Sequence, residues 1–144
     1  MTTALDIMHA DAQCVSADET LVDAARRMRD LGVGALPICG EDNRLAGIIT
    51  DRDIVIRCLA EGKDPNTTRA RDLAQGRPFY VEADTEVDQV LQQMMEHKVK
   101  RMPVIDNHQL VGMISEADLA KNLSEEKLGQ FVEAIKSGPA DRVT

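Results

Sequence analysis

The sequence predicts a mixed α/β (α+β) fold made of two β-α-β-β-α units. The first observation behind this prediction is an internal repeat: one constant shift aligns Met28 with Met94 and Pro37 with Pro103. Chance does not keep one register through two whole segments. The second observation is that the same hydrophobic periodicities occur in both copies, and the third is a polar linker at Glu61–Thr68 between them.

Each repeat contains one clear amphipathic helix. Apolar residues recur at i, i+3, i+4 and i+7 from Leu21 to Met28, and again from Val87 to Met94. This spacing places them on one stripe of a helix, which we expect to be buried. We expect Asp18 and Asp84 to act as N-caps, and Gly32 to end the first of these helices.

Two short β runs joined by a polar turn follow each of these helices, and a further helix follows each hairpin. The predicted hairpin strands cover 33–38 with 45–50, and 99–105 with 110–115. The other predicted elements are short strands near 13–15 and 79–81, helices near 52–59 and 117–123, and a C-terminal helix over 124–136. We place the first domain at 7–64, the second at 72–127, and a C-terminal helix and tail at 128–144.

Composition excludes several classes of partner. The chain has 17 Lys and Arg against 25 Asp and Glu, for a net charge of −8, and only 2% aromatic residues. It therefore lacks both the cationic field and the stacking platforms of nucleic-acid binders. No window approaches the roughly 18 apolar residues of a membrane helix, and the start is not basic. We expect a cytoplasmic protein without membrane contact, with non-classical secretion left open.

One motif with possible chemistry occurs in both repeats at a strand-to-helix junction. Segments 47–53 and 112–118 share the pattern Gly-x-x-(Thr/Ser)-x-x-Asp. A hydroxyl such as that of Thr50 or Ser115 can bond a phosphate at this place, and a carboxylate one turn later, Asp53 or Asp118, can chelate the two hydroxyls of a ribose. The alternative is that these side chains only cap their helices.

The duplicated motif, preceded each time by a strand that contains proline, resembles the CBS domain, present here as a tandem pair over nearly the whole chain. The resemblance implies two units packed about a pseudo-twofold axis, called a Bateman module, with adenine nucleotides in the clefts between them. AMP, ATP and S-adenosylmethionine are the ligands it suggests, and no cofactor is required. In that case Thr50 and Ser115 face phosphate, Asp53 and Asp118 hold ribose, and adenine is read through the backbone beside the prolines, at Leu36, Ile38, Met102 and Val104.

The two predicted sites are not equivalent. Lys100 and Arg101 precede the strand proline of the second repeat, where the first repeat has Gly34 and Ala35. The second repeat is therefore the better phosphate site. We expect a non-catalytic regulatory module that acts on an unidentified protein partner or across a homodimer. The alternative is a ligand-free interaction protein that acts through dimerisation.

Enzymatic and metal sites are not predicted. The run from Ile48 to Asp53 superficially resembles the nucleophile motif of a phosphatase, but Asp51 becomes Glu116 in the second repeat. His9, His97 and His108 lack the spacing of metal ligands. We therefore expect no catalytic residue and no metal.

Apolar helix residues predict a homodimer, because they exceed what one small core needs. The residues expected at this interface are Ile54, Val55, Cys58, Leu59, Val90, Leu91 and Met94.

Cys14 and Cys39 are candidates for a disulfide. They lie on strands that a β-α-β crossover commonly makes parallel neighbours, so their Cα atoms can fall within about 7 Å. The alternative is two reduced core cysteines, as is normal inside cells. We expect Cys58 to be an inert buried thiol.

Overall fold

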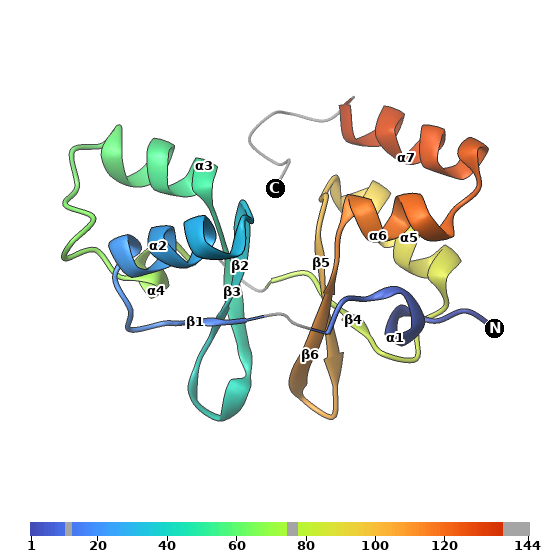
Figure 1. Ribbon diagram of the computed structural model, residues 1–144, viewed down its shortest axis with the longest axis horizontal. Coiled ribbons are helices and arrows are strands. Elements are labelled where there is room, and N and C mark those ends of the chain that lie inside the picture. Colours follow the sequence, from blue (N-terminus) through green and yellow to red (C-terminus); the bar gives the residue numbers. More distant parts are fainter. Residues whose placement is uncertain (11–12, 75–77, 137–144) are drawn as a thin grey trace. The chain divides into compact units, whose positions relative to one another are not determined.

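The computed structural model describes residues 1–10, 13–74 and 78–136, and it confirms an α+β fold with two three-stranded sheets (Figure 1). The chain forms two compact units. We call residues 13–74 with Pro78 the α2 unit, and residues 1–10 with 79–136 the α5 unit. The first ten residues thus group with the second repeat, which differs from the boundaries predicted from the sequence.

The α2 unit is the first repeat. Strand β1 runs parallel to β2, which pairs antiparallel with β3, so the predicted hairpin and the predicted parallel neighbours are both confirmed. The helix after the hairpin begins as a short α-helix and continues as a π-helix, η2. Its elements are β1 (Val15–Ser16), α2 (Leu21–Leu31), β2 (Ala35–Cys39), η1 (Glu41–Asn43), β3 (Leu45–Thr50), α3 (Asp51–Asp53), η2 (Ile54–Leu59) and α4 (Ala70–Leu73).

The α5 unit repeats this order and adds a helix at its end. Its sheet has the same pattern, with β4 parallel to β5 and β5 antiparallel to β6. Its elements are α1 (Ala4–Ile7), β4 (Val81–Glu82), α5 (Val87–His97), β5 (Met102–Asp106), β6 (Gln109–Ile114), α6 (Glu116–Asn122) and α7 (Glu125–Lys136). Each unit buries one apolar cluster between its sheet and its helices.

The predicted caps of the long helices are right at one end and wrong at the other. The N-cap of α2 is Thr20, whose hydroxyl accepts a hydrogen bond from the N–H of Asp23, and the N-cap position of α5 is Glu86. Asp18 and Asp84 lie two residues too early, in the turns after β1 and β4. At the other end, Gly32 has the left-handed conformation that a C-cap requires, with φ of 69°.

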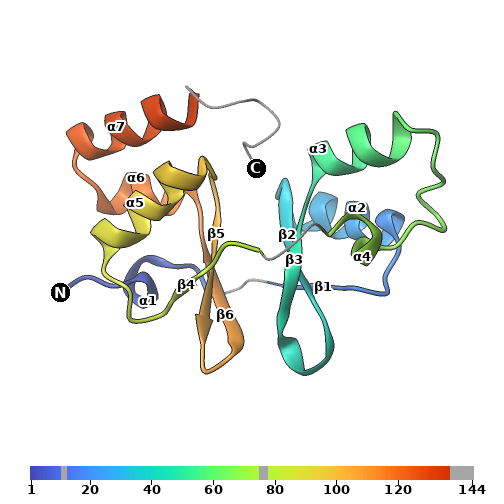
Figure 2. The same cartoon turned by 180° about the vertical axis from the view of Figure 1, so that it is seen from behind.

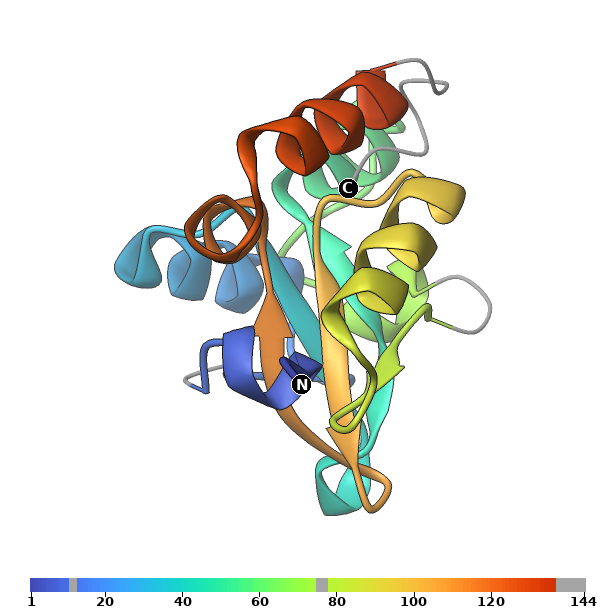
Figure 3. The ribbon, with the colours of Figure 1, turned by 90° about the vertical axis from the view of Figure 1, so that its right-hand side faces the viewer.

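Short helices are exchanged between the repeats. Helix α1 precedes the first repeat but packs in the α5 unit, where Ala4 and Ile7 are buried beside α5, α6 and β6 (Figure 3). Helix α4 precedes the second repeat but packs in the α2 unit, where Ala70 and Leu73 are buried. Each unit therefore completes its core with a segment that leads into the other repeat.

Helix α7 confirms the predicted C-terminal helix. It lies along α5 and α6 of its own unit (Figure 2), and Phe131 and Ile135 are buried in that core. Polar contacts hold both of its ends: Lys127 Nζ lies 2.7 Å from Asp88 Oδ1, and Lys98 Nζ donates to the carbonyl of Ala134 at 3.0 Å. Among the described residues, no helix is both long enough and apolar enough to cross a bilayer.

Most of the residues predicted to face a second subunit belong to the cores instead. Five of them are buried within their own unit, because the helix stripes that carry them pack on the sheets. These five are Ile54, Cys58, Val90, Leu91 and Met94. Val55 and Leu59 remain exposed, at 52% and 54%. Any dimer surface on these helices is thus confined to the α2 unit.

Candidate functional site

The predicted hydroxyl and carboxylate of the second repeat lie together where β6 ends and α6 begins. Ser115 is the N-cap of α6 and Asp118 is its third residue. Asp118 Oδ2 accepts hydrogen bonds from the Ser115 N–H at 2.8 Å and from the Ser115 hydroxyl at 2.9 Å. These two bonds fix the orientation of the carboxylate, and the Asp118 side chain is 14% exposed.

A third group, His9, contacts the same carboxylate oxygen. His9 Nδ1 lies 2.8 Å from Asp118 Oδ2, and the imidazole is 48% exposed. The backbone of His9 forms an antiparallel bridge to Met113 on β6, with N···O distances of 3.0 and 3.1 Å. The sequence does not predict this contact, because 109 residues separate His9 from Asp118 and the histidines have no ligand spacing.

Gly112 of the motif makes room for this N-terminal segment. A Cβ atom at Gly112 would overlap the Met8 sulfur and would lie 2.8 Å from the His9 carbonyl oxygen. At Gly47, the same position of the first repeat, a Cβ would lie 3.1 Å from the Cβ of Ala74. The glycine of the motif therefore accommodates the exchanged segment in each unit, which is a packing role.

The first repeat has the same cap with a different third partner. Asp53 Oδ2 accepts the N–H of Thr50 at 3.0 Å, and Thr50 Oγ1 accepts the N–H of Asp53 at 3.0 Å. Arg57 reaches Asp53 Oδ1 at 3.8 Å and donates to the carbonyl of Leu73 at 2.7 Å. Thr50 is only 5% exposed, so its hydroxyl is less accessible than the half-buried Ser115.

Charge near the two motifs differs as well. Lys100 and Arg101 are half-buried just before β5, and within the described part of the chain neither forms an ion pair. In the first repeat, the carboxylate of Asp51 occupies the space beside Gly34, since a Cβ there would lie 3.1 Å from Asp51 Oδ2. The two basic side chains beside the second motif therefore have no counterpart beside the first, where Gly34 and Ala35 stand.

The four strand residues that are predicted to contact adenine have buried side chains. They lie on β2 and β5 within the two apolar clusters. As whole residues they are 0–3% exposed, and β2 and β5 are the middle strands of their sheets, so the contact of their backbone with adenine stays a prediction. These residues are Leu36 and Ile38, which flank Pro37, and Met102 and Val104, which flank Pro103.

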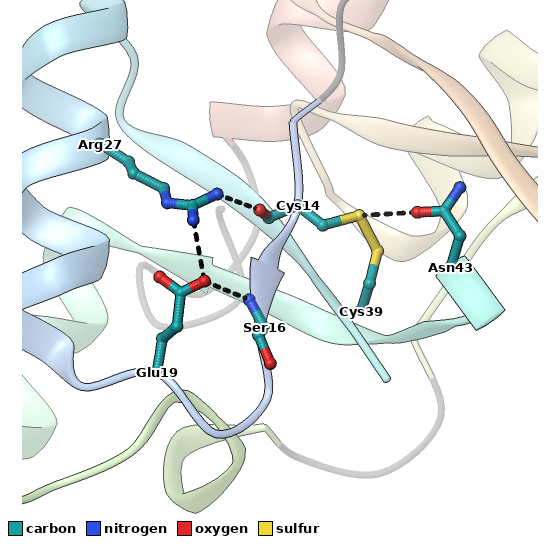
Figure 4. Close-up of a disulfide and its surroundings, with 6 residues drawn as sticks. All are labelled: Cys14, Ser16, Glu19, Arg27, Cys39 and Asn43. Atoms are coloured by element: carbon teal, nitrogen blue, oxygen red, sulfur yellow. Dashed lines mark hydrogen bonds and ion pairs between the residues drawn. A yellow bond between two sulfur atoms is a disulfide. The ribbon is translucent and has the colours of Figure 1, made fainter. Parts of the chain in front are cut away.

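A disulfide joins Cys14 to Cys39 at the edge of the α2 unit, with Cα atoms 5.5 Å apart (Figure 4). The pairing follows the predicted parallel alignment of β1 and β2. Arg27 braces the same edge: it donates to the Cys14 carbonyl at 2.6 Å and pairs with Glu19 at 2.8 Å. Cys58 is a free buried thiol, as expected.

The comparisons with known proteins decide the family. The model of the CBS domain matches residues 4–59 and 70–125. This chain belongs to the CBS-domain family. Hypoxic response protein 1 of Mycobacterium tuberculosis is 53% identical over 137 residues, which cover 95% of this chain and 96% of that protein. CBS-domain proteins are in general non-catalytic regulatory modules, and the resemblance stated from the sequence is confirmed.

Two solved structures are informative neighbours. The crystal structure of hypoxic response protein I, with two coordinated zinc ions, matches at a TM-score of 0.80 and 53% identity, over 85% of this chain and 100% of that one. The structure of CBSX2 in complex with AMP matches at a TM-score of 0.72 and 21% identity, over 84% and 95%. Within residues 1–10, 13–74 and 78–136, no three His, Cys, Asp or Glu side chains lie close enough to hold a metal ion.

Proposed function

We propose that this protein is a regulatory module that binds an adenine nucleotide through the second repeat. The observation that carries the proposal is that hydrogen bonds from Ser115, which is half-buried, fix the orientation of the Asp118 carboxylate. The same repeat also supplies Lys100 and Arg101. AMP is the ligand of CBSX2, a protein of the same fold. The first repeat is the weaker candidate, because its hydroxyl is buried and Asp51 stands where a phosphate would need a cation.

Each group has a distinct chemical part in this proposal. The Asp118 carboxylate accepts hydrogen bonds from the ribose hydroxyls, and Ser115 faces the phosphate while its hydroxyl keeps donating to Asp118. Lys100 and Arg101 neutralise the phosphate charge, with Arg101 able to form two parallel hydrogen bonds. Binding regulates a partner only if the nucleotide favours one conformation of the module over another.

Titration calorimetry with AMP, ATP and S-adenosylmethionine tests the proposal. We expect micromolar binding of at least one of them, about −8 kcal/mol. Asp118→Ala should abolish that binding, and Asp53→Ala, the matched change in the first repeat, should leave the main binding event in place. No heat from any of the three ligands would refute the proposal. Equal loss in the two variants would refute the assignment to the second repeat.

A specific surface supports the second candidate function, an interaction protein that works as a homodimer. A pocket of about 330 Å³ lies between α2 and η2 and is lined mainly by apolar side chains, including Leu21, Val22 and Leu59. Val55 and Ile56 are also exposed on η2. We propose that a second copy covers this face. Leu59→Glu should give monomers in sedimentation velocity, whereas Val132→Glu on exposed α7 should not; dimers that persist in Leu59→Glu contradict the proposal.

A link to oxygen limitation is proposed from the relative alone. Hypoxic response protein 1 carries that role in its name, and its identity to this chain extends over almost the whole of both. We expect the amount of this protein to rise when its source organism is deprived of oxygen. Quantitative proteomics of aerated and oxygen-limited cultures tests this, and an unchanged amount contradicts it.

A further inference from the structure

The Asp118 carboxylate carries one more hydrogen bond than its helix needs. Ser115 supplies two donors to Oδ2, which complete the N-terminal cap of α6. The third partner, His9 Nδ1, comes from the N-terminal segment, and it lies as close as the backbone donor, at 2.8 Å. Three partners within 2.9 Å saturate one carboxylate oxygen, so Oδ2 has no place for a further donor.

In the symmetric chelation of a ribose by a carboxylate, each of the two carboxylate oxygens accepts a hydrogen bond from one hydroxyl. Oδ2 can serve only if one existing donor leaves. The Ser115 N–H belongs to the backbone and cannot leave, and the Ser115 hydroxyl is anchored in the cap, where its oxygen also accepts the Asp118 N–H at 3.4 Å. The His9 imidazole is half exposed and projects from a segment whose backbone is held separately, so it is the donor that can rotate away.

We propose that His9 limits the affinity of the nucleotide site: its imidazole occupies Asp118 in the empty site and is displaced by the ribose hydroxyls. This inference rests on the proposed function. It also links nucleotide binding to the N-terminal segment, because the side chain released from Asp118 belongs to that segment and not to either strand of the hairpin.

The backbone around His9 makes displacement a local event. Two hydrogen bonds to Met113 hold the residue on β6, and Met8 packs over Gly112. Ala4 and Ile7 anchor the preceding helix in the core. Only the imidazole has to move, by rotation about its side-chain bonds. Asp53 has no such partner from an exchanged segment among the described residues; its additional contact is Arg57, from its own helix.

Calorimetry of AMP binding to the full chain, to His9→Ala and to His108→Asn tests the proposal. His108 is a matched control because it lies exposed in the β5–β6 turn of the same unit, where Asn tolerates its φ of 67°. An exposed pair of this kind contributes little, so we expect His9→Ala to tighten AMP binding by about two- to five-fold, or about 0.4–1 kcal/mol. His108→Asn should bind as the unaltered chain does.

A second readout follows the imidazole itself. In ¹⁵N spectra of the histidine rings, the Nδ1 signal of His9 should move when AMP is added and should move in the same direction in Asp118→Asn without AMP. Binding by the unaltered chain with unchanged or weakened affinity in His9→Ala overturns the role of His9 and leaves the nucleotide site standing. Absence of binding in both the unaltered chain and His9→Ala overturns the nucleotide site, and the role of His9 falls with it.

Discussion

Replacing Gly112 by alanine tests the exchange of segments between the repeats. The backbone of Gly112 is not in the left-handed region, so alanine suffers no conformational penalty there. The cost comes from the new Cβ, which would overlap the Met8 sulfur and lie 2.8 Å from the His9 carbonyl oxygen. Met8 is flexible and can move, but that oxygen accepts the Met113 N–H at 3.1 Å and cannot move without weakening the bond.

The expected magnitude follows from these two contacts. Overpacking in a close-packed region costs about 1–3 kcal/mol, and a strained backbone hydrogen bond adds up to about 1 kcal/mol. We therefore expect Gly112→Ala to lower the free energy of unfolding by about 1–4 kcal/mol. At Gly47 the nearest atom is the Cβ of Ala74 at 3.1 Å, which needs a shift of a few tenths of an ångström, so Gly47→Ala should cost less than about 1 kcal/mol.

Urea unfolding followed by circular dichroism measures both variants. Gly129→Ala is the matched control: it lies in α7 with no atom within 4 Å of the new Cβ, and it should stabilise the chain by about 0.5–1 kcal/mol through helix propensity. The slope of free energy against urea should stay constant in all three variants. The packing argument would be refuted if the free energy of unfolding of Gly112→Ala lay within about 0.5 kcal/mol of the parent value. It would also be refuted if Gly112→Ala lost less stability than Gly47→Ala.

Three further predictions concern stability. Cys14→Ser with Cys39→Ser opens a link between residues 25 apart and should lower the free energy of unfolding by about 3 kcal/mol, which urea unfolding with and without reductant will measure. Phe131→Ala should cost about 3–5 kcal/mol, because Phe131 is 1% exposed in the core of the α5 unit; a loss below 1 kcal/mol would show that α7 is not docked there. The N–H and hydroxyl of Thr3 donate to Asp6 and hold its pKa below the ordinary value. The lowered pKa adds stability above the unfolded-state pKa that is lost as pH falls through the folded-state pKa, and NMR titration should show the Asp6 midpoint rising in Thr3→Ala.

Local periodicity explains why so much of the fold could be predicted from the sequence. The stripes from Leu21 to Met28 and from Val87 to Met94 each cover two turns, and both helices form as expected. Helices α1 and α4 have four residues each, one turn, so no periodicity can develop in them. Which unit each of these helices joins depends on tertiary packing, so it can be seen only in the folded structure.

In the candidate site, too, the local contacts could be predicted from the sequence and the long-range contact could not. Ser115 and Asp118 are three residues apart, and their capping geometry follows from that spacing. His9 reaches them through a β-bridge to Met113, and nothing in the spacing of the histidines signals that contact. The sequence predicts the N-caps of α2 and α5 two residues too early. Asp18 and Asp84 are residue types that favour an N-cap, but the chain still bends for two residues after each of them.

The most direct test of nucleotide binding at the second repeat is a ¹H–¹⁵N correlation spectrum of the full chain titrated with AMP. We predict that the largest shift changes fall on the amides of Arg101, Ser115 and Asp118, with saturation at micromolar to submillimolar AMP. Changes confined to the first repeat around Thr50 and Asp53, or no change at all, would contradict it.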